Sequence, residues 1–467
     1  MSGATYQEFV ASKHRLAAPV GFDPIVLNEN LFDFQRDLVR WACRRGRSAL
    51  FCDTGLGKSL QSLSWAENVC LHTGGRVLIL APLAVANQTV REAGKFGIGG
   101  VAYARSDSAT DARIVVTNYE MMHHFDVASY VGVVIDESSC LKAYDSKTRI
   151  AITESFASTP FRLACSATPA PNDFMELGNH SEFLSILTRA EMLATYFVHD
   201  GGETQKWRLK GHAEESFWEW MCSWGALVRK PSDLGYDDGA FELPPLHVHQ
   251  HVIAASHTEA LAMGKLFIDD ARTLHEQRAA RRSTIDARVA KAAELASDGE
   301  QWILWCDLND EGNALARAID GAVQVSGSDS LDEKEDRLLG FAAGKYRCLV
   351  TKGSIASQGL NFQNCARQAF VGVSHSWETW YQAIRRSLRF GQLRPVHIHV
   401  ITSELEGPVV ENLMRKEDEA KRMSGEMGAR TKRYVRAAVS GARRELRAYH
   451  PTVPMDPLPP WLVSSPD

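Results

Sequence analysis

The chain lacks the features that would place it outside the ordinary globular proteins. Its nine cysteines are scattered over 467 residues and form no Cys-x-x-Cys pair, which excludes a disulfide framework and a cysteine zinc site. Apolar runs such as 131–135 are far shorter than the roughly 20 residues of a membrane-spanning helix. Residues 1–8 lack the basic and apolar regions of a secretory signal. We therefore expect a cytoplasmic protein with reduced thiols and no membrane partner.

The chain also lacks an excess of positive charge. It has 52 Lys and Arg against 57 Asp and Glu, a net charge of −5, which argues against coating nucleic acid through bulk charge but permits a locally basic groove. Residues 429–467 are the exception, because basic residues clearly outnumber acidic ones there. Apolar residues make up 45% and charged residues 23%, as in a globular protein with a full core.

Short apolar segments alternate with helical patterns, which predicts an α/β protein with two similar-sized lobes, a helical insertion and linker between them, and a helical C-terminal tail. The predicted domains are an N-terminal arm (1–30), domain 1 (31–180), the insertion and linker (181–245), domain 2 (246–407) and a basic, Pro-rich tail (408–467). The predicted strands of domain 1 are 48–52, 76–80, 114–117, 131–135 and 161–165. Those of domain 2 are 302–306, 322–325, 348–351, 368–373 and 397–401.

A glycine-rich loop follows the first predicted strand and precedes a helix. Backbone N–H groups of such a loop can surround phosphate oxygens at a helix N-terminus. Lys58 would reach the β- and γ-phosphates, and the Ser59 hydroxyl would bind Mg²⁺. The alternative is an ordinary glycine turn. The residues predicted to bind ATP here are Asp53, Thr54, Gly55, Leu56, Gly57, Lys58 and Ser59.

An acidic pair ends the apolar segment 131–135. A carboxylate at the carboxyl edge of a parallel strand points into the crevice where such sheets bind ligands. Asp136 can hold Mg²⁺ together with Ser59, and Glu137 can position or deprotonate the attacking water. The alternative is a solvated loop end.

Taken together, these segments resemble the superfamily-two helicases, in particular the Swi/Snf-type DNA translocases. The resemblance covers roughly residues 30–405, and it implies that the two lobes are tandem RecA-like domains with parallel sheets. It rests on the segments LFDFQR (31–36), DTGLGKS (53–59), APL (81–83), TNYE (117–120), IDESS (135–139), SAT (166–168), WCDLN (305–309), SQGLN (357–361) and QAIRRSLRFGQ (382–392), and on the linker sequences LVRK (227–230) and LPP (243–245). The small size is typical of compact prokaryotic or bacteriophage members.

The resemblance implies roles for further residues. Gln35 would read the adenine edge, and Gly359 would belong to the nucleotide site. The nucleic acid would contact Pro82, Thr117, Asn118, Ser166, Thr168, Thr351, Ser357 and Gln358. The segment IDESS (135–139) departs from the family pattern, because Ser138 and Ser139 stand where many relatives carry Ala or Gly and then His.

The second domain is predicted to supply the positive charge that hydrolysis needs on the γ-phosphate. Arg386 and Arg389 are three residues apart and would share one helix face with Gln382. We expect these three residues to be catalytic and Arg385, on another face, to contact solvent or nucleic acid. The alternative is a solvated basic helix.

Three other features keep two interpretations each. The histidines at 247, 249, 251, 397 and 399 favour an ordinary strand face over a metal site. The tryptophans at 207, 218, 220 and 224 favour core packing over base stacking. The basic segment 430–447 could either follow phosphates or form a solvated helix face.

The sequence thus predicts an ATP- and Mg²⁺-dependent motor that moves along nucleic acid, most simply duplex DNA, as a monomer. One alternative is a strand-separating helicase on single-stranded DNA or RNA. The other is a nucleotide-switched DNA-binding accessory subunit of a replication, repair or restriction complex.

Overall fold

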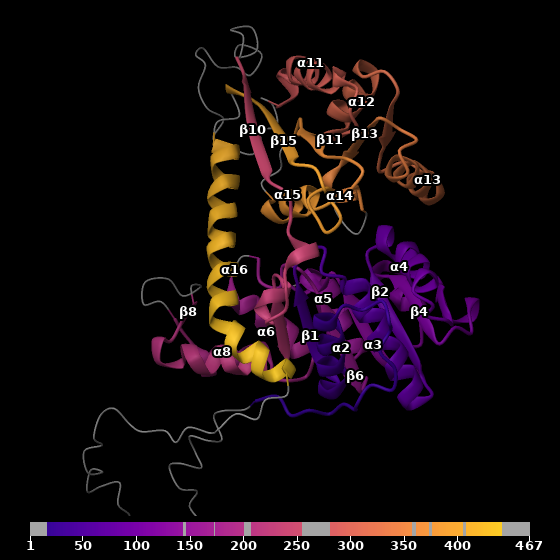
Figure 1. The fold of residues 1–467 in the computed structure, drawn as a ribbon, viewed down its shortest axis with the longest axis vertical. Coiled ribbons are helices and arrows are strands. Elements are labelled where there is room, and N and C mark those ends of the chain that lie inside the picture. The colour runs from indigo at the N-terminus through magenta and orange to yellow at the C-terminus, as the bar shows by residue number, and fades with distance from the viewer. Residues whose placement is uncertain are drawn as a thin grey trace, which may run out of the picture.

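We analysed a computed structural model, which describes residues 16–142, 146–171, 173–199, 207–254, 281–356, 361–372, 376–404 and 408–440. Two parallel sheets, each covered by helices, form two lobes that lie one above the other (Figure 1). This arrangement confirms the predicted fold class of two tandem α/β domains. The predicted residues Ser357, Gln358 and Gly359 lie outside the described residues, as do 1–15 and 441–467.

The first lobe has a seven-stranded sheet in the order β3-β4-β2-β5-β6-β1-β9, with every pairing parallel. Its interior strands are almost fully buried, as expected for a sheet covered on both faces. The strands are β1 (Arg47–Cys52), β2 (Arg76–Ala81), β3 (Val101–Tyr103), β4 (Ile114–Asn118), β5 (Tyr130–Asp136), β6 (Phe161–Cys165) and β9 (Gly225–Val228). The helices are α2 (Asp33–Arg45), α3 (Lys58–Thr73), α4 (Leu83–Lys95), α5 (Lys147–Ser155), α6 (Leu177–Phe183), α7 (Arg189–Tyr196) and α8 (Glu214–Cys222).

The first lobe extends beyond the predicted boundary at residue 180. β9 comes from the segment 181–245 and pairs with β1, so part of the predicted insertion belongs to this sheet. The same segment holds a two-stranded antiparallel sheet of β7 (Phe197–His199) and β8 (Trp207–Leu209). The side chains of Trp218, Trp220 and Trp224 are buried at 0–2% exposure, which confirms core packing for these three.

The second lobe has a six-stranded parallel sheet in the order β10-β15-β14-β11-β13-β12. Each predicted strand is present, and the edge strand β10 contains the histidines at 247, 249 and 251 that were expected on a strand face. The strands are β10 (Leu246–Ile253), β11 (Trp302–Cys306), β12 (Ala322–Val325), β13 (Cys348–Lys352), β14 (Arg367–Phe370) and β15 (Val396–Ser403). The helices are α11 (Ile285–Leu295), α12 (Asn309–Ala318), α13 (Leu331–Ala342), α14 (Gly353–Ala356) and α15 (Trp377–Ile384).

A long helix, α16 (Pro408–Ser440), runs along both lobes (Figure 1). Met414 packs against the core of the second lobe, whereas Met427 and Val435 are buried in the core of the first. Its basic residues pair with acidic residues of the first lobe: Arg430 with Glu214, and Arg433 with Glu215. These pairs favour a structural role for the basic helix over phosphate tracking.

The histidines of β10 and β15 form a ladder between two strands in register. His249 and His397 approach to 3.1 Å between ring nitrogens, and His251 and His399 to 3.0 Å. Within the described residues no group of three or more His, Cys, Asp or Glu side chains has the arrangement of a metal site. The ladder is therefore a stacked strand face.

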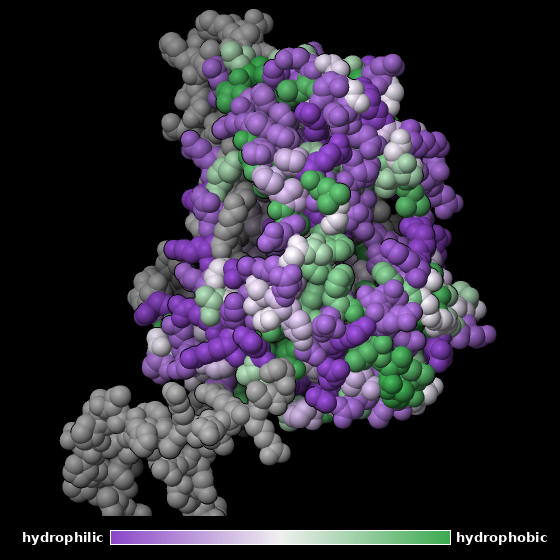
Figure 2. Space-filling view, viewed as in Figure 1, coloured by the Kyte–Doolittle hydropathy of each residue, from purple (hydrophilic) through white to green (hydrophobic). Residues whose placement is uncertain are grey.

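Hydrophilic residues cover most of the face seen in Figure 2, and the apolar patches on it are separate from one another. Among the described residues, no helix combines the length and apolar character needed to cross a membrane.

Candidate nucleotide site between the lobes

The glycine loop lies between β1 and the first turn of α3, as predicted. Gly57 is the N-cap of α3 and has a φ of 77°, and a Cβ there would lie 2.4 Å from the Gln35 Nε2 atom. Gly55 has a φ of 92°, and a Cβ there would meet the backbone nitrogen of Phe390 at 2.9 Å. Both positions therefore need glycine, for backbone conformation and for close approach.

Two predicted nucleotide-binding side chains are held by the backbone of this loop. Lys58 Nζ donates hydrogen bonds to the carbonyl oxygens of Cys52 and Asp53, at 2.9 and 3.4 Å. Gln35 Nε2 donates to the Leu56 carbonyl oxygen at 2.8 Å, and its Oε1 accepts from the Phe32 N–H at 2.9 Å. The loop is thus preorganised, and a nucleotide would exchange the carbonyl partners of Lys58 for phosphate oxygens.

The acidic pair lies at the carboxyl end of β5, next to this loop. Asp136 is 7% exposed, and burial, with the adjacent charge of Glu137, raises the pKa of its carboxyl to about 7, although Lys58 opposes this. Glu137 has a φ of 55°, in the left-handed region that a non-glycine residue seldom adopts. Strained backbone and a perturbed carboxyl in one cleft are typical of a functional site.

Ser138, which directly follows the acidic pair, has a buried partner. The Ser138 hydroxyl lies 3.1 Å from His180 Nε2 of α6. Burial lowers the pKa of His180 to about 4, so this imidazole is neutral at physiological pH. Sequence reasoning missed His180, because nothing in the sequence pairs a helix 40 residues away with the acidic motif.

Two arginines of the second lobe lie near the acidic residues of the first lobe. Arg386 is 3% exposed, and burial lowers its pKa to about 10, against the opposing charges of Glu137 and Asp136. Burial, with the charge of Arg386, lowers the pKa of Arg389 to about 10 as well. Arg386 thus lies close enough to both predicted carboxylates to feel their charge, and Arg389 close enough to feel that of Glu137. Arg389 Cβ is also 3.7 Å from the position that a Cβ would take at Gly55 of the glycine loop.

The predicted helix face for these arginines is wrong. α15 ends at Ile384, and Arg386 and Arg389 lie in the tight turns that follow. The turns are held from the sheet side, because Gln368 Nε2 donates to the Ile384 carbonyl oxygen and to the Ser387 hydroxyl. Of the predicted three, Gln382 is buried in α15, and its carbonyl oxygen accepts from Arg386 Nε at 3.0 Å.

Arg385 is also placed differently from the expectation. Its guanidinium lies 4.0 Å from the Asp53 carboxylate and stacks on the ring of Tyr381 at 5.0 Å. The Tyr381 hydroxyl donates to Asp53 Oδ1 at 2.7 Å. These contacts join the second lobe to the glycine loop. Sequence reasoning missed Tyr381, although its position directly before Gln382 was a usable signal.

The predicted nucleic-acid contacts lie at the carboxyl edges of the two sheets, but most of their side chains are buried. Those at most 8% exposed are Thr117, Asn118, Ser166, Thr168 and Thr351. The Thr351 hydroxyl donates to the Val325 carbonyl oxygen at 3.2 Å, and the Ser166 hydroxyl accepts from the Thr168 N–H at 3.1 Å. In this state these side chains shape the edges of the sheets. Pro82 is partly exposed.

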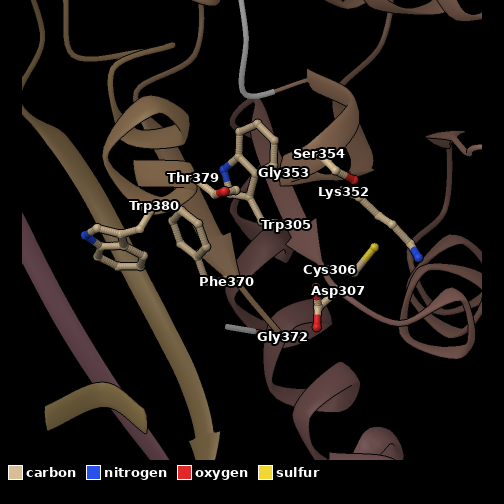
Figure 3. A pocket seen from close by; sticks show the side chains of 10 residues that line it. All are labelled: Trp305, Cys306, Asp307, Lys352, Gly353, Ser354, Phe370, Gly372, Thr379 and Trp380. Carbon is tan, nitrogen blue, oxygen red and sulfur yellow. The ribbon is translucent and has the colours of Figure 1, made fainter. Parts of the chain in front are cut away.

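Next to Thr351, the carboxyl ends of β11, β13 and β14 enclose a pocket of about 120 Å³ (Figure 3). Lys352 and Ser354 line it, together with Asp307 and Thr379. Crevices at the carboxyl ends of parallel strands are the usual ligand sites of such sheets. The lining thus combines one cation, Lys352, with one carboxylate, Asp307, and the hydroxyls of Ser354 and Thr379.

The first lobe is similar in sequence to a known family of domains. Residues 34–192 match the SNF2-related domain family. A solved structure, the Sulfolobus solfataricus SWI2/SNF2 ATPase core in complex with dsDNA, is 19% identical over 90% of this chain and 98% of that chain, with a TM-score of 0.41. No curated protein matches. The first lobe is thus similar in sequence to SNF2-related domains.

Proposed function

We propose that the protein is a nucleic-acid-dependent ATPase that hydrolyses ATP between its lobes and uses the cycle to move along duplex DNA. The observation that carries this proposal is the position of the buried Arg386 of the second lobe near Asp136 and Glu137, with Arg389 beside the glycine loop. Arginines at developing phosphoryl charge supply much of the rate enhancement in such enzymes. The similarity to SNF2-related domains supports the same reaction.

The chain's own residues suit MgATP. Asp136 and Ser59 would hold Mg²⁺, and they offer the oxygen ligands that this ion prefers. Burial, and then the charge of Glu137, raise the pKa of Asp136, and a bound cation would favour its charged form. When bound, the ion would supply positive charge that offsets the charge of the phosphates. Lys58 would bind the β- and γ-phosphates, and Glu137 would orient the attacking water and take its proton.

Closure of the lobes would complete the site. Tyr381 and Arg385 already bind Asp53 from the second lobe, and Lys142 forms an ion pair with Glu378 across the same gap. Loss of the γ-phosphate would remove the anion that Arg386 and Arg389 share with the first lobe. The lobes could then separate, and a different grip on the nucleic acid in each state would move the protein along it.

The test is steady-state ATP hydrolysis with Mg²⁺, alone and with duplex DNA, single-stranded DNA or RNA. We expect strong stimulation by duplex DNA and none in the Glu137→Gln protein. Stimulation mainly by single strands or RNA would instead indicate a strand-separating helicase. ATP binding without stimulated hydrolysis would indicate a switch subunit that needs a partner. Normal hydrolysis by a folded Glu137→Gln protein would contradict the assignment of Glu137.

A further inference from the structure

A further contact joins the lobes between α4 and α13. Asn87 Nδ2 of α4 donates to Glu335 Oε2 of α13 at 2.9 Å. Arg91 Nη1 of α4 donates to Glu335 Oε1 at 2.5 Å. One carboxylate of the second lobe therefore has both of its oxygens bound by the first lobe.

Asn87 and Arg91 together form a binding site for an anion that presents two oxygen atoms. Asn87 and Arg91 are four residues apart on α4, so their side chains lie on the same helix face. An arginine beside a second donor binds a carboxylate or a phosphate in the same way, since both anions present two oxygens to parallel N–H groups. Glu335 thus shows that this face of α4 can hold a phosphate.

This pair of donors lies beside the sheet edges that are predicted to contact nucleic acid. α4 starts directly after β2, whose last residues pair with Thr117 and Asn118 of β4. α13 follows β12, which pairs with β13 and so lies next to Lys352. The two helices face each other on the side of the molecule away from α16 (Figure 1). A strand that crosses from one edge to the other would pass this contact.

Charge and exposure suit an exchange of anions. The first two turns of α13 carry Asp332, Glu333, Glu335 and Asp336 against Lys334 and Arg337, so this part of the helix has a net negative charge that would repel a phosphate chain. The side chains of Arg91 and Glu335 are 47% and 34% exposed. Ion pairs this exposed are weak, so a phosphate can displace the carboxylate.

We propose that Asn87 and Arg91 bind a phosphate of the nucleic acid, and that Glu335 occupies this site while no nucleic acid is bound. The inference rests on the proposed function, and it deepens it. Binding of nucleic acid would release α13 from α4 and so change the contact between the lobes. Nucleic-acid binding and lobe movement would be coupled through one exchange of anions.

The test compares the two partners of the ion pair in the full chain, with a fluorescent DNA duplex titrated at several salt concentrations. Arg91→Ala should weaken binding about three- to tenfold and reduce the slope of log K against log salt by about one. Glu335→Gln should strengthen binding up to about fivefold and leave the slope unchanged. Asp332→Asn is the matched control, because it removes one exposed acidic charge from the same helix.

Opposite shifts for Arg91→Ala and Glu335→Gln, with a smaller effect of Asp332→Asn, are the expected result. Shifts in the same direction would show a simple strut between the lobes and overturn the inference. An equal gain from Asp332→Asn and Glu335→Gln would show bulk repulsion alone and also overturn it. Both outcomes leave the proposed function standing, whereas a wild-type protein that binds no nucleic acid would overturn both.

Discussion

The two lobes hold their halves of the candidate nucleotide site by different means. In the first lobe, backbone carbonyl groups bind Lys58 and Gln35, and the loop conformation itself depends on two glycines. In the second lobe, Arg386 and Arg389 lie in turns beyond α15 and are positioned by burial and side-chain contacts. The first half is therefore complete within one lobe, whereas the second half depends on how the lobes meet.

This difference predicts a separation of binding from chemistry, which is the largest effect we expect. Lys58→Ala should lose nucleotide binding. Arg386→Ala should keep nucleotide affinity within a few-fold but lower kcat by roughly 10³ or more, because it removes charge stabilisation from the transition state. Fluorescent-nucleotide titration and steady-state hydrolysis would measure the two quantities.

Arg394→Ala is the control for Arg386→Ala, since Arg394 is an exposed arginine of the same lobe paired with Glu300. It should leave kcat unchanged. Wild-type turnover by Arg386→Ala would remove the proposed role of the second lobe in chemistry. Loss of nucleotide affinity in that variant would show that the arginine acts already in binding.

The lobes also differ in how they support the edges of their sheets. In the second lobe, Glu311 is fully buried, pairs with the buried Arg288 at 2.9 Å and accepts from the backbone N–H of Asp307 and Leu308. Glu311→Gln should therefore lower the free energy of unfolding by about 3–5 kcal/mol, because it leaves a buried guanidinium without its counter-charge. Denaturant unfolding followed by tryptophan fluorescence would measure the loss.

The exposed pair Lys291 and Glu294 gives the comparison for that loss. Glu294→Gln should change stability by less than about 1 kcal/mol. If both variants had equally small effects, the ion pair of Glu311 would contribute no more than a surface contact. The loop after β11, which lines the pocket of Figure 3, would then be held mainly by packing.

A smaller effect concerns pH and the acidic pair of the first lobe. The pKa of Asp136 is raised to about 7 in the folded protein, from an ordinary value of 3.8. The folded state therefore holds this proton while the unfolded state has lost it, so the contribution to stability is present at low pH and is lost as pH rises from about 4 to about 7. Asp136→Asn should be more stable than the wild-type protein at pH 8, by at least about 1 kcal/mol, and the gain should shrink at pH 5.

Thermal unfolding without nucleotide at both pH values would check this sign. Asp111→Asn, a change at an exposed carboxylate of the same lobe, should show no such pH dependence. A gain for Asp136→Asn that is equal at pH 5 and pH 8 would contradict the raised pKa.

The sequence predicted the parts of the molecule that depend on local pattern. The strand before the glycine loop and the strands that carry Asp136 and Thr351 were predicted to within one residue, because strands covered on both faces are continuous apolar runs. The loop glycines were predicted because their spacing has a direct backbone meaning. β10 was predicted only from its alternating histidines, because most of its residues are exposed and it lacks the apolar pattern.

What depended on tertiary packing was missed. A helical period was assumed through Arg386 and Arg389, but hydrogen bonds from Gln368, a strand residue, hold the chain in turns. Arg385 was expected at the surface and instead faces Asp53 of the other lobe. The contact between Arg385 and Asp53 joins residues more than 300 positions apart in sequence, and no local spacing encodes it.

The smallest predicted effect separates stability from activity at one residue. Glu137 adopts φ 55°, which costs a non-glycine residue about 1 kcal/mol or more, whereas glycine adopts it freely. Glu137→Gly should therefore stabilise the protein by about 1 kcal/mol and abolish hydrolysis, while Glu137→Gln should abolish hydrolysis and keep the backbone cost. Denaturant unfolding of the two variants side by side isolates the backbone term, because both lack the carboxylate. Equal stability would mean that the left-handed turn at Glu137 is not strained. Of the two costs proposed for this site, the strained backbone and the raised carboxyl pKa of Asp136, the second would then remain.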